Sequence, residues 1–236
     1  MSSLDINRDE LLVGLAKTLS PRRYRTKFFI WYLTVRLTMF IKRVFDAAVS
    51  FLLLILFSPL FALTALCIRL ESKGPVFYSQ TRVGIDGRHF RFFKFRSMVD
   101  GANDMKAELM EDNESGDGVI FKMKKDPRVT RVGGFIRKFS IDELPQLFNV
   151  LIGDMSLVGP RPATPEEVAQ YTLEQRKRLH AVPGITCIWQ VSGRSEIPFE
   201  RQVQLDIEYI KSTSISNDIV ILLKTIPAVL AGKGAY

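Results

Sequence analysis

The chain has 236 residues, and 47% of them are hydrophobic, which is enough to bury a core and excludes a wholly disordered protein. Only two cysteines and two histidines are present, which argues against a disulfide framework and against a metal centre built on these residues. The net charge of +8 arises within residues 11–45, which hold eight basic residues and no acidic one. Such a basic arm binds nucleic acid or rests on anionic lipid headgroups.

The basic arm includes the segment Phe28–Phe40, which is too short to span a membrane and contains Arg36. Its aromatic residues suit an interfacial helix, although a helix packed on a soluble domain fits equally well. Because aromatic residues are interleaved with the bases, the arm fits a membrane better than a groove of nucleic acid, and we expect no nucleic-acid partner. Residues 1–20 have the pattern of a short amphipathic helix.

The next segment, Ala47–Ile68, is a run of 22 residues without a charge. A straight helix of this length reaches about 33 Å, enough for a hydrocarbon core of about 30 Å. However, Ser58 and Pro59 interrupt its middle, where the proline removes a backbone hydrogen bond that the serine hydroxyl can replace. Both flanks are basic, so a helix that bends and returns competes on level terms with a spanning helix. The flanking bases are Lys42, Arg43, Arg69 and Lys73. Asp46 lies four residues after Lys42, which predicts an ion pair at the membrane boundary.

The remainder is expected to be a small α+β domain, rich in helices and containing one β-hairpin. Two strand-like runs surround the turn Asp86-Gly87, and the second, with phenylalanines that do not alternate with the bases, is predicted to be buried on both faces. Helices are predicted over Thr164–Leu179 and Phe199–Lys211. Lys224 and Pro227 interrupt the last apolar stretch, Ile219–Ala231.

The residues that suggest chemistry lie between positions 137 and 161. Ser140 and Glu143 have the spacing of a capping box, which predicts a helix over Ile141–Ile152 that ends at Gly153. Most acidic pairs at such a position only cap a helix. The alternative is that the free N–H groups attract a phosphate and keep Asp142 ionised, as a nucleophile requires.

Arginines on both sides of the acidic pair support the chemical interpretation. Arg137 precedes the predicted helix, and Arg161 is held between Pro160 and Pro162, which restrict the backbone that carries this planar donor. A carboxylate that attacks, a second carboxylate for a divalent ion and arginines for phosphate oxygens would together form a diphosphate site. The chain contains no P-loop, no G-x-G-x-x-G, no D-x-D and no G-x-S-x-G motif.

Short segments of distinctive sequence follow one another from residue 42 almost to the C-terminus. They are Lys42-Arg43-Val44-Phe45-Asp46, Ser58-Pro59, Gly74–Gly84, Phe93–Met98, Arg137, Asp142–Leu147, Asn149-Val150, Gly153–Pro162, Pro183–Thr186 and Trp189–Arg194. In this order they resemble the monotopic phosphoglycosyl transferases, bacterial sugar transferases that begin glycan assembly on a polyprenol carrier. Val182 and Cys187 depart from the family pattern, where a basic residue and a glycine are usual, and this affects the expected donor preference.

For the architecture, the resemblance implies a re-entrant membrane helix, bent at Ser58-Pro59, with both ends on the cytoplasmic side of the bacterial inner membrane. The expected division is a basic interfacial segment at 1–41, the membrane helix at 42–72 and a cytosolic catalytic domain at 73–236. The partners would be the phospholipid bilayer, a UDP-sugar donor and undecaprenyl phosphate, and a homodimer is compatible with the sequence.

For the chemistry, the resemblance implies transfer of a sugar-1-phosphate from a UDP-sugar to undecaprenyl phosphate in exopolysaccharide, capsule or O-antigen synthesis. Asp142 would be the nucleophile, forming a covalent phosphosugar intermediate, and Glu143 would assist, with both as ligands of Mg²⁺. Further residues are expected to contact phosphate or nucleotide groups, namely Arg137, Arg161, Arg194, Lys94 and Arg96. The alternative is a non-catalytic membrane scaffold that binds a nucleotide sugar without turning it over.

Overall fold

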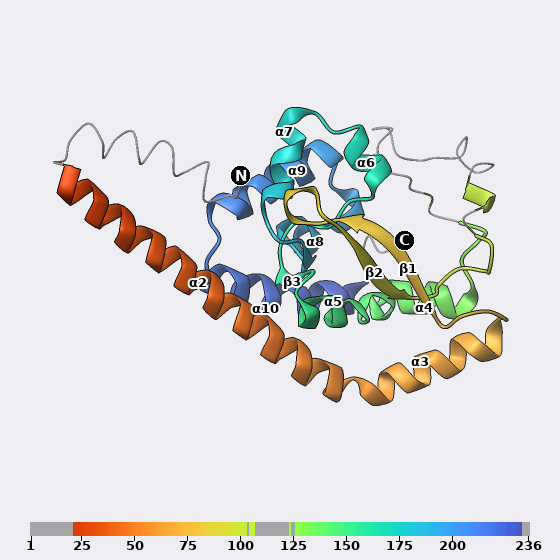
Figure 1. Cartoon of the computed structure of the whole chain (residues 1–236). Coiled ribbons are helices and arrows are strands. Elements are labelled where there is room, and N and C mark those ends of the chain that lie inside the picture. Colours follow the sequence, from red (N-terminus) through yellow and green to blue (C-terminus); the bar gives the residue numbers. More distant parts are fainter. Residues whose placement is uncertain (1–20, 103, 107–122, 124–125, 233–236) are drawn as a thin grey trace.

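A computed structural model of the chain describes residues 21–102, 104–106, 123 and 126–232, so the helix predicted over residues 1–20 lies outside the described residues. Helices dominate and two small sheets accompany them, which confirms the predicted α+β class (Figure 1). The α-helices are α2 (Pro21–Leu56), α3 (Ser58–Glu71), α4 (Arg131–Lys138), α5 (Gln146–Ile152), α6 (Pro165–Ala169), α7 (Leu173–Arg176), α8 (Ile188–Ser192), α9 (Phe199–Lys211) and α10 (Ile215–Ala231). The strands are β1 (Phe77–Val83), β2 (His89–Phe95), β3 (Ser156–Val158) and β4 (Gly184–Thr186), and 3₁₀ turns are η1 (Ile85–Gly87), η2 (Asp104–Lys106), η4 (Ile141–Glu143), η5 (Lys177–His180) and η6 (Arg194–Glu196).

The helices α2 and α3 form a bent pair that runs along one side of the molecule (Figure 1). Their axes differ by 60°, and the break lies between Leu56 and Ser58. Pro59 has no N–H to donate to the carbonyl of Ile55, and the Ser58 hydroxyl donates to that oxygen instead, at 2.8 Å. The backbone repair predicted at the break is therefore present.

The bent pair also settles how the N-terminal segments are joined. Residues 28–40 do not form a separate helix, because α2 continues without a break as far as Leu56. The predicted division at residue 41 thus coincides with no boundary between elements. None of the described helices has by itself the length and apolar composition to cross a membrane, whereas α2 and α3 taken together have both.

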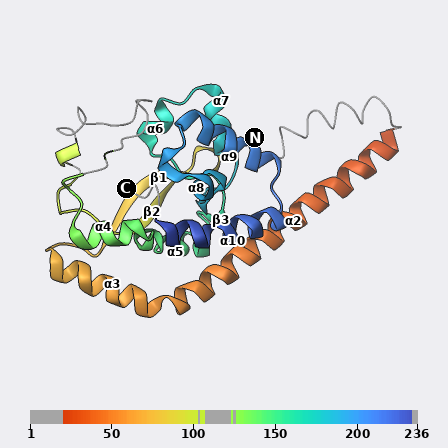
Figure 2. The same cartoon turned by 180° about the vertical axis from the view of Figure 1, so that it is seen from behind.

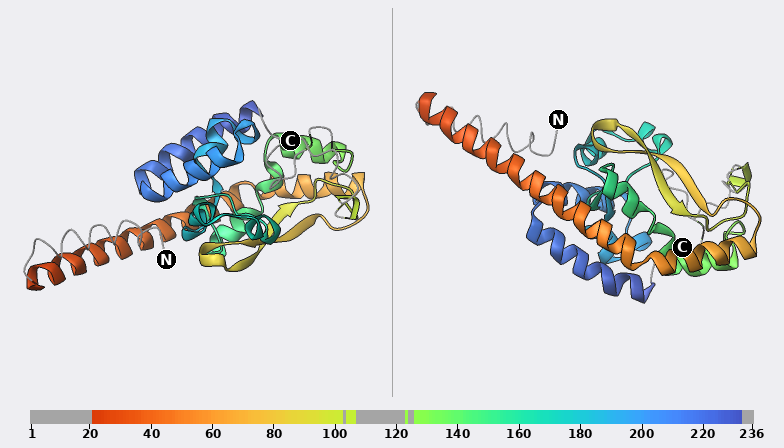
Figure 3. Two further views of the ribbon diagram at one scale, coloured as in Figure 1. Left: turned by 90° about the horizontal axis from the view of Figure 1, so that it is seen from above. Right: turned by 60° about the horizontal axis from the view of Figure 1, so that its bottom comes forward.

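The helix α2 is fastened to the domain by the two bases that precede the apolar run. Arg43 donates to two carbonyls in the last turn of α5, at 2.5 and 2.7 Å, where the unsatisfied oxygens of a helix attract a cation. The Lys42 ammonium lies 2.5 Å from Asp218 on α10 and 3.6 Å from Asp46, so the predicted pair with Asp46 is formed. From behind and from below, α10 runs beside α2 (Figures 2 and 3).

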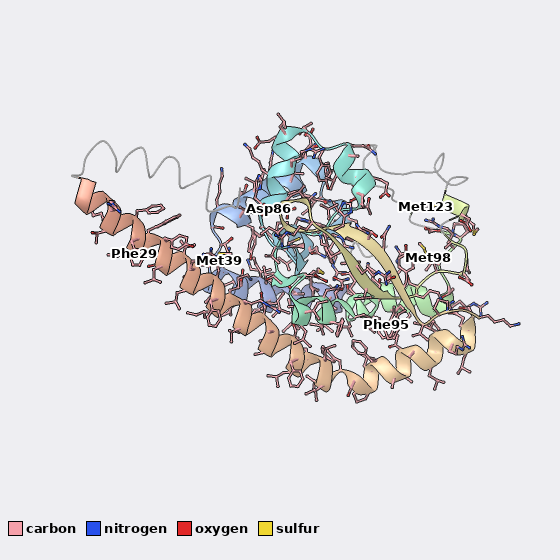
Figure 4. All side chains as sticks on the ribbon, viewed as in Figure 1. Phe29, Met39, Asp86, Phe95, Met98 and Met123 are labelled. Carbon is pink, nitrogen blue, oxygen red and sulfur yellow. The ribbon has the colours of Figure 1, made fainter. Side chains whose placement is uncertain are left out.

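The predicted β-hairpin is confirmed. Strands β1 and β2 are antiparallel, with Phe77 opposite Phe95, and the turn between them contains Asp86 in a left-handed conformation with φ of 53°. Figure 4 shows Asp86 at the tip of the hairpin and Phe95 near its other end. Phe92 and Phe95 lie on opposite faces of β2 and are both buried, so both faces of the strand are covered, as predicted.

The main hydrophobic core joins the hairpin to the helices behind it. Its buried members come from β2, α5, β3, α9 and α10, and they include Phe92, Leu147, Val150, Leu157, Tyr209 and Ile221. Part of α2, near Phe45 and Val49, packs against the same cluster. The core therefore holds the start of the bent pair and the strand β2 in one unit.

Two of the helix predictions have different outcomes. The helix over Phe199–Lys211 is confirmed at both ends. The helix predicted over Thr164–Leu179 is wrong in its continuity, because a second capping box, Thr172 with Gln175, restarts the chain as α7 and ends α6 early. The last apolar stretch lies within a single helix, α10, which continues through Pro227.

Candidate active site

The acidic pair Asp142 and Glu143 lies in the single 3₁₀ turn η4, which connects α4 to α5. The continuous helix predicted over Ile141–Ile152 is wrong in its first part, because the α-helix begins only at Gln146. Pro145 explains the difference: it has no N–H, and its ring clashes with the carbonyl four residues earlier when the chain is α-helical. The acidic pair is therefore presented by a tight turn.

The capping box predicted between Ser140 and Glu143 is also absent. Ser140 has a left-handed backbone, with φ of 54°, and its side chain makes no capping hydrogen bond. This conformation turns the chain sharply after α4 and directs the following residues into the domain. Gly153 ends α5 as predicted, with φ of 102°. Since η4 is only one turn long, the charges near Asp142 come mainly from side chains rather than from a helix dipole.

Two cations converge on one carboxylate oxygen of Glu143. The Lys94 ammonium lies 2.8 Å from Oε1, and the Arg161 guanidinium lies 2.9 Å from the same atom. Lys94 is also 3.7 Å from Oδ2 of Asp142, whose side chain is 8% exposed. Three segments far apart in the sequence thus meet at the acidic pair: the end of β2, the turn η4 and the loop after β3.

The arginine loop is held in place by close backbone contacts between β3 and β4. The N–H of Gly159 donates to the carbonyl of Thr186, and the N–H of Gly184 donates to the carbonyl of Pro160. A Cβ atom on Gly184 would lie 2.0 Å from the nitrogen of Gly159, so only glycine allows this approach. The position of Arg161 is therefore fixed by backbone pairing on its N-terminal side.

The strand that carries Lys94 is fastened to the helix that follows the acidic pair. Asn149 on α5 is fully buried; its amide donates to the carbonyl of Arg91, and its oxygen accepts the N–H of Phe93. Because α5 follows η4 directly, these bonds fix the distance between Lys94 and the acidic pair. The sequence segment Asn149-Val150 thus has a positioning role in the site.

The two carboxyl groups have different electrostatic environments. Burial raises the pKa of Asp142 above its ordinary value of 3.8; Lys94 opposes this shift and the adjacent Glu143 carboxylate reinforces it. Burial acts in the same direction on Glu143, but Arg161 and Lys94 outweigh it and hold the pKa of Glu143 below its ordinary value. Glu143 is thus the permanently charged member, and Asp142 is the more basic one. The expectation that the helix end lowers the proton affinity of Asp142 does not hold.

The acidic pair lies in a cleft with a volume of about 840 Å³. Apolar side chains line it from α2, α5 and α10, which lie in the lower part of Figure 1; this apolar wall includes Val49, Leu53, Leu147, Leu222, Ile226 and Val229. Polar and aromatic side chains line it from β1 and from the region of α6, α7 and α9, which are the helices in the upper part of Figure 1; this polar wall includes Arg82, Glu167, Tyr171, Arg178 and Gln202. One cleft therefore offers both an apolar wall and a basic, polar wall to whatever reaches the carboxylates.

Most of the predicted phosphate contacts line this cleft, but one does not. Arg137 and Arg194 line it, and Arg194 reaches the Ser140 hydroxyl at 3.4 Å. Arg96 is buried elsewhere, and its guanidinium donates to the carbonyls of Ser72 and Lys73 after α3. The prediction that Arg96 faces a substrate phosphate is therefore wrong: it fastens the end of the bent pair to the hairpin. The predicted membrane residues Lys42, Arg43, Asp46, Ser58 and Pro59 all belong to the bent pair, where they hold it to the domain or form its break.

Two arginines of the polar wall were not singled out as site residues from the sequence. Arg178 is buried, pairs with Asp206 at 2.5 Å and contacts the rings of Tyr171 and Phe199. Arg82 lies two residues after Gln80 on β1. Strand alternation could have revealed Arg82, because it points to the same face of the hairpin as Lys94. No sequence signal indicates the partners of Arg178, which lie on α9 and in the loop between α6 and α7.

The acidic pair provides the two carboxylates with which a magnesium ion can be held when substrate phosphates supply further ligands. Among the described residues, no three or more His, Cys, Asp or Glu side chains form a group that could enclose a metal by themselves. Mg²⁺ in phosphate-handling sites is commonly held by one or two carboxylates together with the substrate's phosphates. Asp142 and the oxygen of Glu143 that does not contact Lys94 and Arg161 match that smaller requirement.

Comparison with known proteins places the chain beside bacterial sugar transferases. A family model described as bacterial sugar transferase matches residues 37–232. The galactosyl transferase CpsE of Streptococcus agalactiae is 52% identical over 166 residues, covering 70% of this chain and 37% of its own length. An undecaprenyl-phosphate galactose phosphotransferase of Salmonella typhimurium is 44% identical over 207 residues, which cover 86% of this chain and 43% of that relative. The exopolysaccharide production protein ExoY of Rhizobium meliloti is 39% identical over 198 residues, which cover 83% of this chain and 88% of that relative. The chain thus spans less than half of the first two relatives and most of the third.

Proposed function

The chain belongs to the bacterial sugar transferase family, and on that basis we propose that it transfers a sugar-1-phosphate from a UDP-sugar to undecaprenyl phosphate, with release of UMP. The names of relatives support a lipid-phosphate acceptor, since they include an undecaprenyl-phosphate galactose phosphotransferase and an undecaprenyl-phosphate glucose phosphotransferase. The observation that carries the proposal is the pair Asp142 and Glu143, held by Lys94 and Arg161 in a cleft with one apolar and one basic wall.

In the proposed mechanism, an oxygen of Asp142 attacks the phosphorus that carries the sugar. The bond from that phosphorus to the bridging oxygen breaks, UMP departs with the electron pair, and the sugar phosphate remains on the carboxylate as an acyl phosphate. A phosphate oxygen of the lipid then attacks the same phosphorus, and Asp142 leaves as a carboxylate. The raised pKa of Asp142 supports this role, because a more basic carboxylate is a stronger nucleophile once ionised.

The other charged residues are assigned by their positions. Glu143 holds Lys94 and Arg161 close to the attacked phosphorus, and Arg137 and Arg194 provide further positive charge on the rim. When bound by Asp142, Glu143 and the diphosphate, Mg²⁺ would neutralise charge on the phosphate oxygens. In the two attacks on phosphorus, the groups contributed by the protein are side chains of this chain.

The surface of α2 and α3 supports a membrane location for the cleft. Large apolar side chains are exposed along both helices, among them Phe29, Phe40, Leu52, Leu56, Leu63 and Leu70. We assign these residues to the lipid phase, with α2–α3 as a re-entrant pair and the domain on the cytoplasmic face of the inner membrane. The apolar wall of the cleft is formed partly by α2, so a lipid acceptor could enter from the same side.

The test of the activity is UMP release by the purified chain from a panel of UDP-sugars, with undecaprenyl phosphate and Mg²⁺. We expect UMP from at least one donor, and only when both the donor and the chain are present. The rate should fall by orders of magnitude in Asp142→Asn and stay unchanged in Asp86→Asn, which alters an exposed carboxylate at the hairpin tip. Binding of a nucleotide sugar without UMP from any donor would support the scaffold alternative instead.

A further inference from the structure

The inner face of the hairpin carries a second cation beside Lys94. On β1 this face consists of Tyr78, Gln80 and Arg82, which lie opposite Lys94, Phe92 and Phe90 of β2. The Phe92 ring separates the two cations: its centroid is 5.3 Å from Cζ of Arg82 and 5.5 Å from Nζ of Lys94. Lys94 holds the acidic pair, whereas Arg82 has no part in the mechanism described above.

The charge of Arg82 is poorly neutralised for a group that is 15% exposed. Among the described residues, one carboxylate lies within 4.0 Å of it, that of Glu167 at 3.9 Å, and this carboxylate already accepts the N–H of Thr164 in a capping box. Within the same part of the structure, the Nε atom of Arg82 is buried without a hydrogen-bond partner. Buried charges are normally paired, so a cation in this state is suited to an anionic ligand.

The position of Arg82 brings it next to the arginine of the acidic site. Its Nη1 atom donates to the carbonyl of Pro162 at 3.1 Å, directly after Arg161 in the chain. Burial and the charge of Arg161 both lower the pKa of Arg82, which shows that the two guanidinium groups act on each other. A single dianion can bridge two adjacent guanidinium groups, and their planar donors match phosphate oxygens.

We propose that Arg82 binds the diphosphate of the nucleotide donor together with Arg161, a role that rests on the transferase activity proposed above. The donor is favoured over the lipid phosphate because Arg82 lies on the polar wall of the cleft, with Glu167, Tyr171 and Gln202, and not with the apolar side chains of α2 and α10. In the competing explanation, Arg82 only braces the loop of Arg161 through the carbonyl of Pro162.

Titration of the full-length chain in lipid nanodiscs with UDP, in the presence of Mg²⁺, tests the proposal. We expect Arg82→Gln to weaken UDP binding about tenfold or more, which is typical for loss of a hydrogen-bonded charge. Arg82→Lys should retain part of the affinity. The matched control is Arg91→Gln, which removes an exposed arginine on the outer face of the same hairpin and should bind UDP like the wild type.

A double-mutant cycle separates direct binding from bracing. In an Arg161→Lys background, titrated up to millimolar UDP, a direct contact predicts that Arg82→Gln still weakens binding severalfold. If Arg82 acts only through Arg161, the second substitution has no added effect, and the proposal is overturned. Thermal unfolding of each variant confirms that it is folded, and Arg82→Lys replaces any Gln variant that is not.

The outcome for the wild type distinguishes this proposal from the proposed function. If the wild type releases UMP and binds UDP while Arg82→Gln binds UDP equally well, only the role of Arg82 is refuted. If the wild type neither binds UDP nor releases UMP from any donor, both proposals fail.

Discussion

At the scale of single residues, the site assigns different properties to two adjacent carboxyl groups. Glu143 receives two cations on one oxygen, and these hold the pKa of its carboxyl group below the ordinary value. Asp142 has a more distant contact with Lys94, at 3.7 Å, and burial is the main influence on the pKa of its carboxyl group. Adjacent positions in the chain thus hold a more acidic carboxyl group, that of Glu143, and a more basic one, that of Asp142, which is the proposed nucleophile.

The raised pKa of Asp142 predicts a pH dependence. Only the ionised carboxylate attacks phosphorus, so the single-turnover rate of enzyme labelling should rise with pH and level off above the pKa of Asp142, which lies above 3.8. Lys94→Met removes the cation that opposes burial, and the acidic limb of the profile should move to higher pH. Lys177→Met, which changes an exposed lysine, is the control and should leave it in place. If the acidic limb of the Lys94→Met profile stays at the same pH or moves to lower pH, Lys94 does not oppose the effect of burial on Asp142.

The residues of this site could be predicted only in part from the sequence. The capping spacing and the prolines pointed to Asp142, Glu143 and Arg161 as candidates. That Lys94 and Arg161 share one oxygen of Glu143 could not be predicted, because these residues come from segments 49 and 18 positions away. Arg96 shows the opposite error: a basic residue in a motif is buried for structural reasons, and its hydrogen bonds to carbonyls leave no signature in the sequence.

At the scale of elements, the junction between α2 and the domain depends on a buried polar cluster. The Lys42 ammonium lies between the carboxylates of Asp46 and Asp218, which are both buried. The Ser156 hydroxyl donates to Asp46, and the Tyr209 hydroxyl donates to Asp218, so the cluster joins α2 to β3, α9 and α10. Without the ammonium, two buried carboxylates would remain uncompensated.

Lys42→Met is therefore expected to destabilise the protein by about 3 kcal/mol, as is typical when one partner of a buried ion pair is removed. At about 2–4 °C per kcal/mol for a chain of this size, the midpoint of thermal unfolding should fall by several degrees. The matched control is Lys177→Met, which breaks a surface pair with Glu174 and should cost about 1 kcal/mol or less. Equal shifts for the two variants would show that the cluster does not hold α2.

The break between α2 and α3 predicts that both ends of the pair lie on one side of the membrane. Single cysteines are placed at Arg25 and at Lys73, exposed basic residues near the two ends of the pair, in a chain with Cys67 and Cys187 replaced by alanine. Neither should react with an impermeant maleimide in intact cells, and both should react after lysis. Labelling of either position from outside would show a spanning arrangement.

The elements themselves could be predicted where local signals were strong. The hairpin is predicted by its Asp86-Gly87 turn, and the helix predicted over Phe199–Lys211 has the bounds of α9. The failures share one cause: a proline or a second cap overrode a longer pattern, as Pro145 does before α5 and Thr172 does before α7. A proline does not always end a helix, since α10 continues through Pro227.

At the scale of the whole molecule, the N-terminal half of α2 extends beyond the domain (Figures 1 and 4). Figure 4 shows Phe29 and Met39 on this part, and both side chains are exposed, as are Ile30, Leu33 and Leu37. Such a surface on a long helix is unusual in water and typical of contact with lipid. The sequence predicted an apolar and basic arm, but its continuity with the bent helix became visible only in the structure.

A lipid position for this arm can be tested with the fluorescence of Trp31. The other tryptophan, Trp189, is buried and can be replaced by phenylalanine. In liposomes that contain brominated lipids, the emission of Trp31 should be strongly quenched, because bromine quenches only at short range. In the same liposomes, acrylamide in the water should quench weakly. Strong acrylamide quenching without bromine quenching would place the arm in solution.

The central claim concerns the atom that first takes the phosphosugar. Incubating the wild type with a UDP-sugar in the absence of undecaprenyl phosphate should add the mass of one sugar phosphate to the intact protein, and peptide analysis should locate it on Asp142. Addition of undecaprenyl phosphate should remove it, and Asp142→Asn should never acquire it while Asp86→Asn does. A full yield of the adduct in Asp142→Asn, or product formation in the wild type without any adduct, would contradict this account.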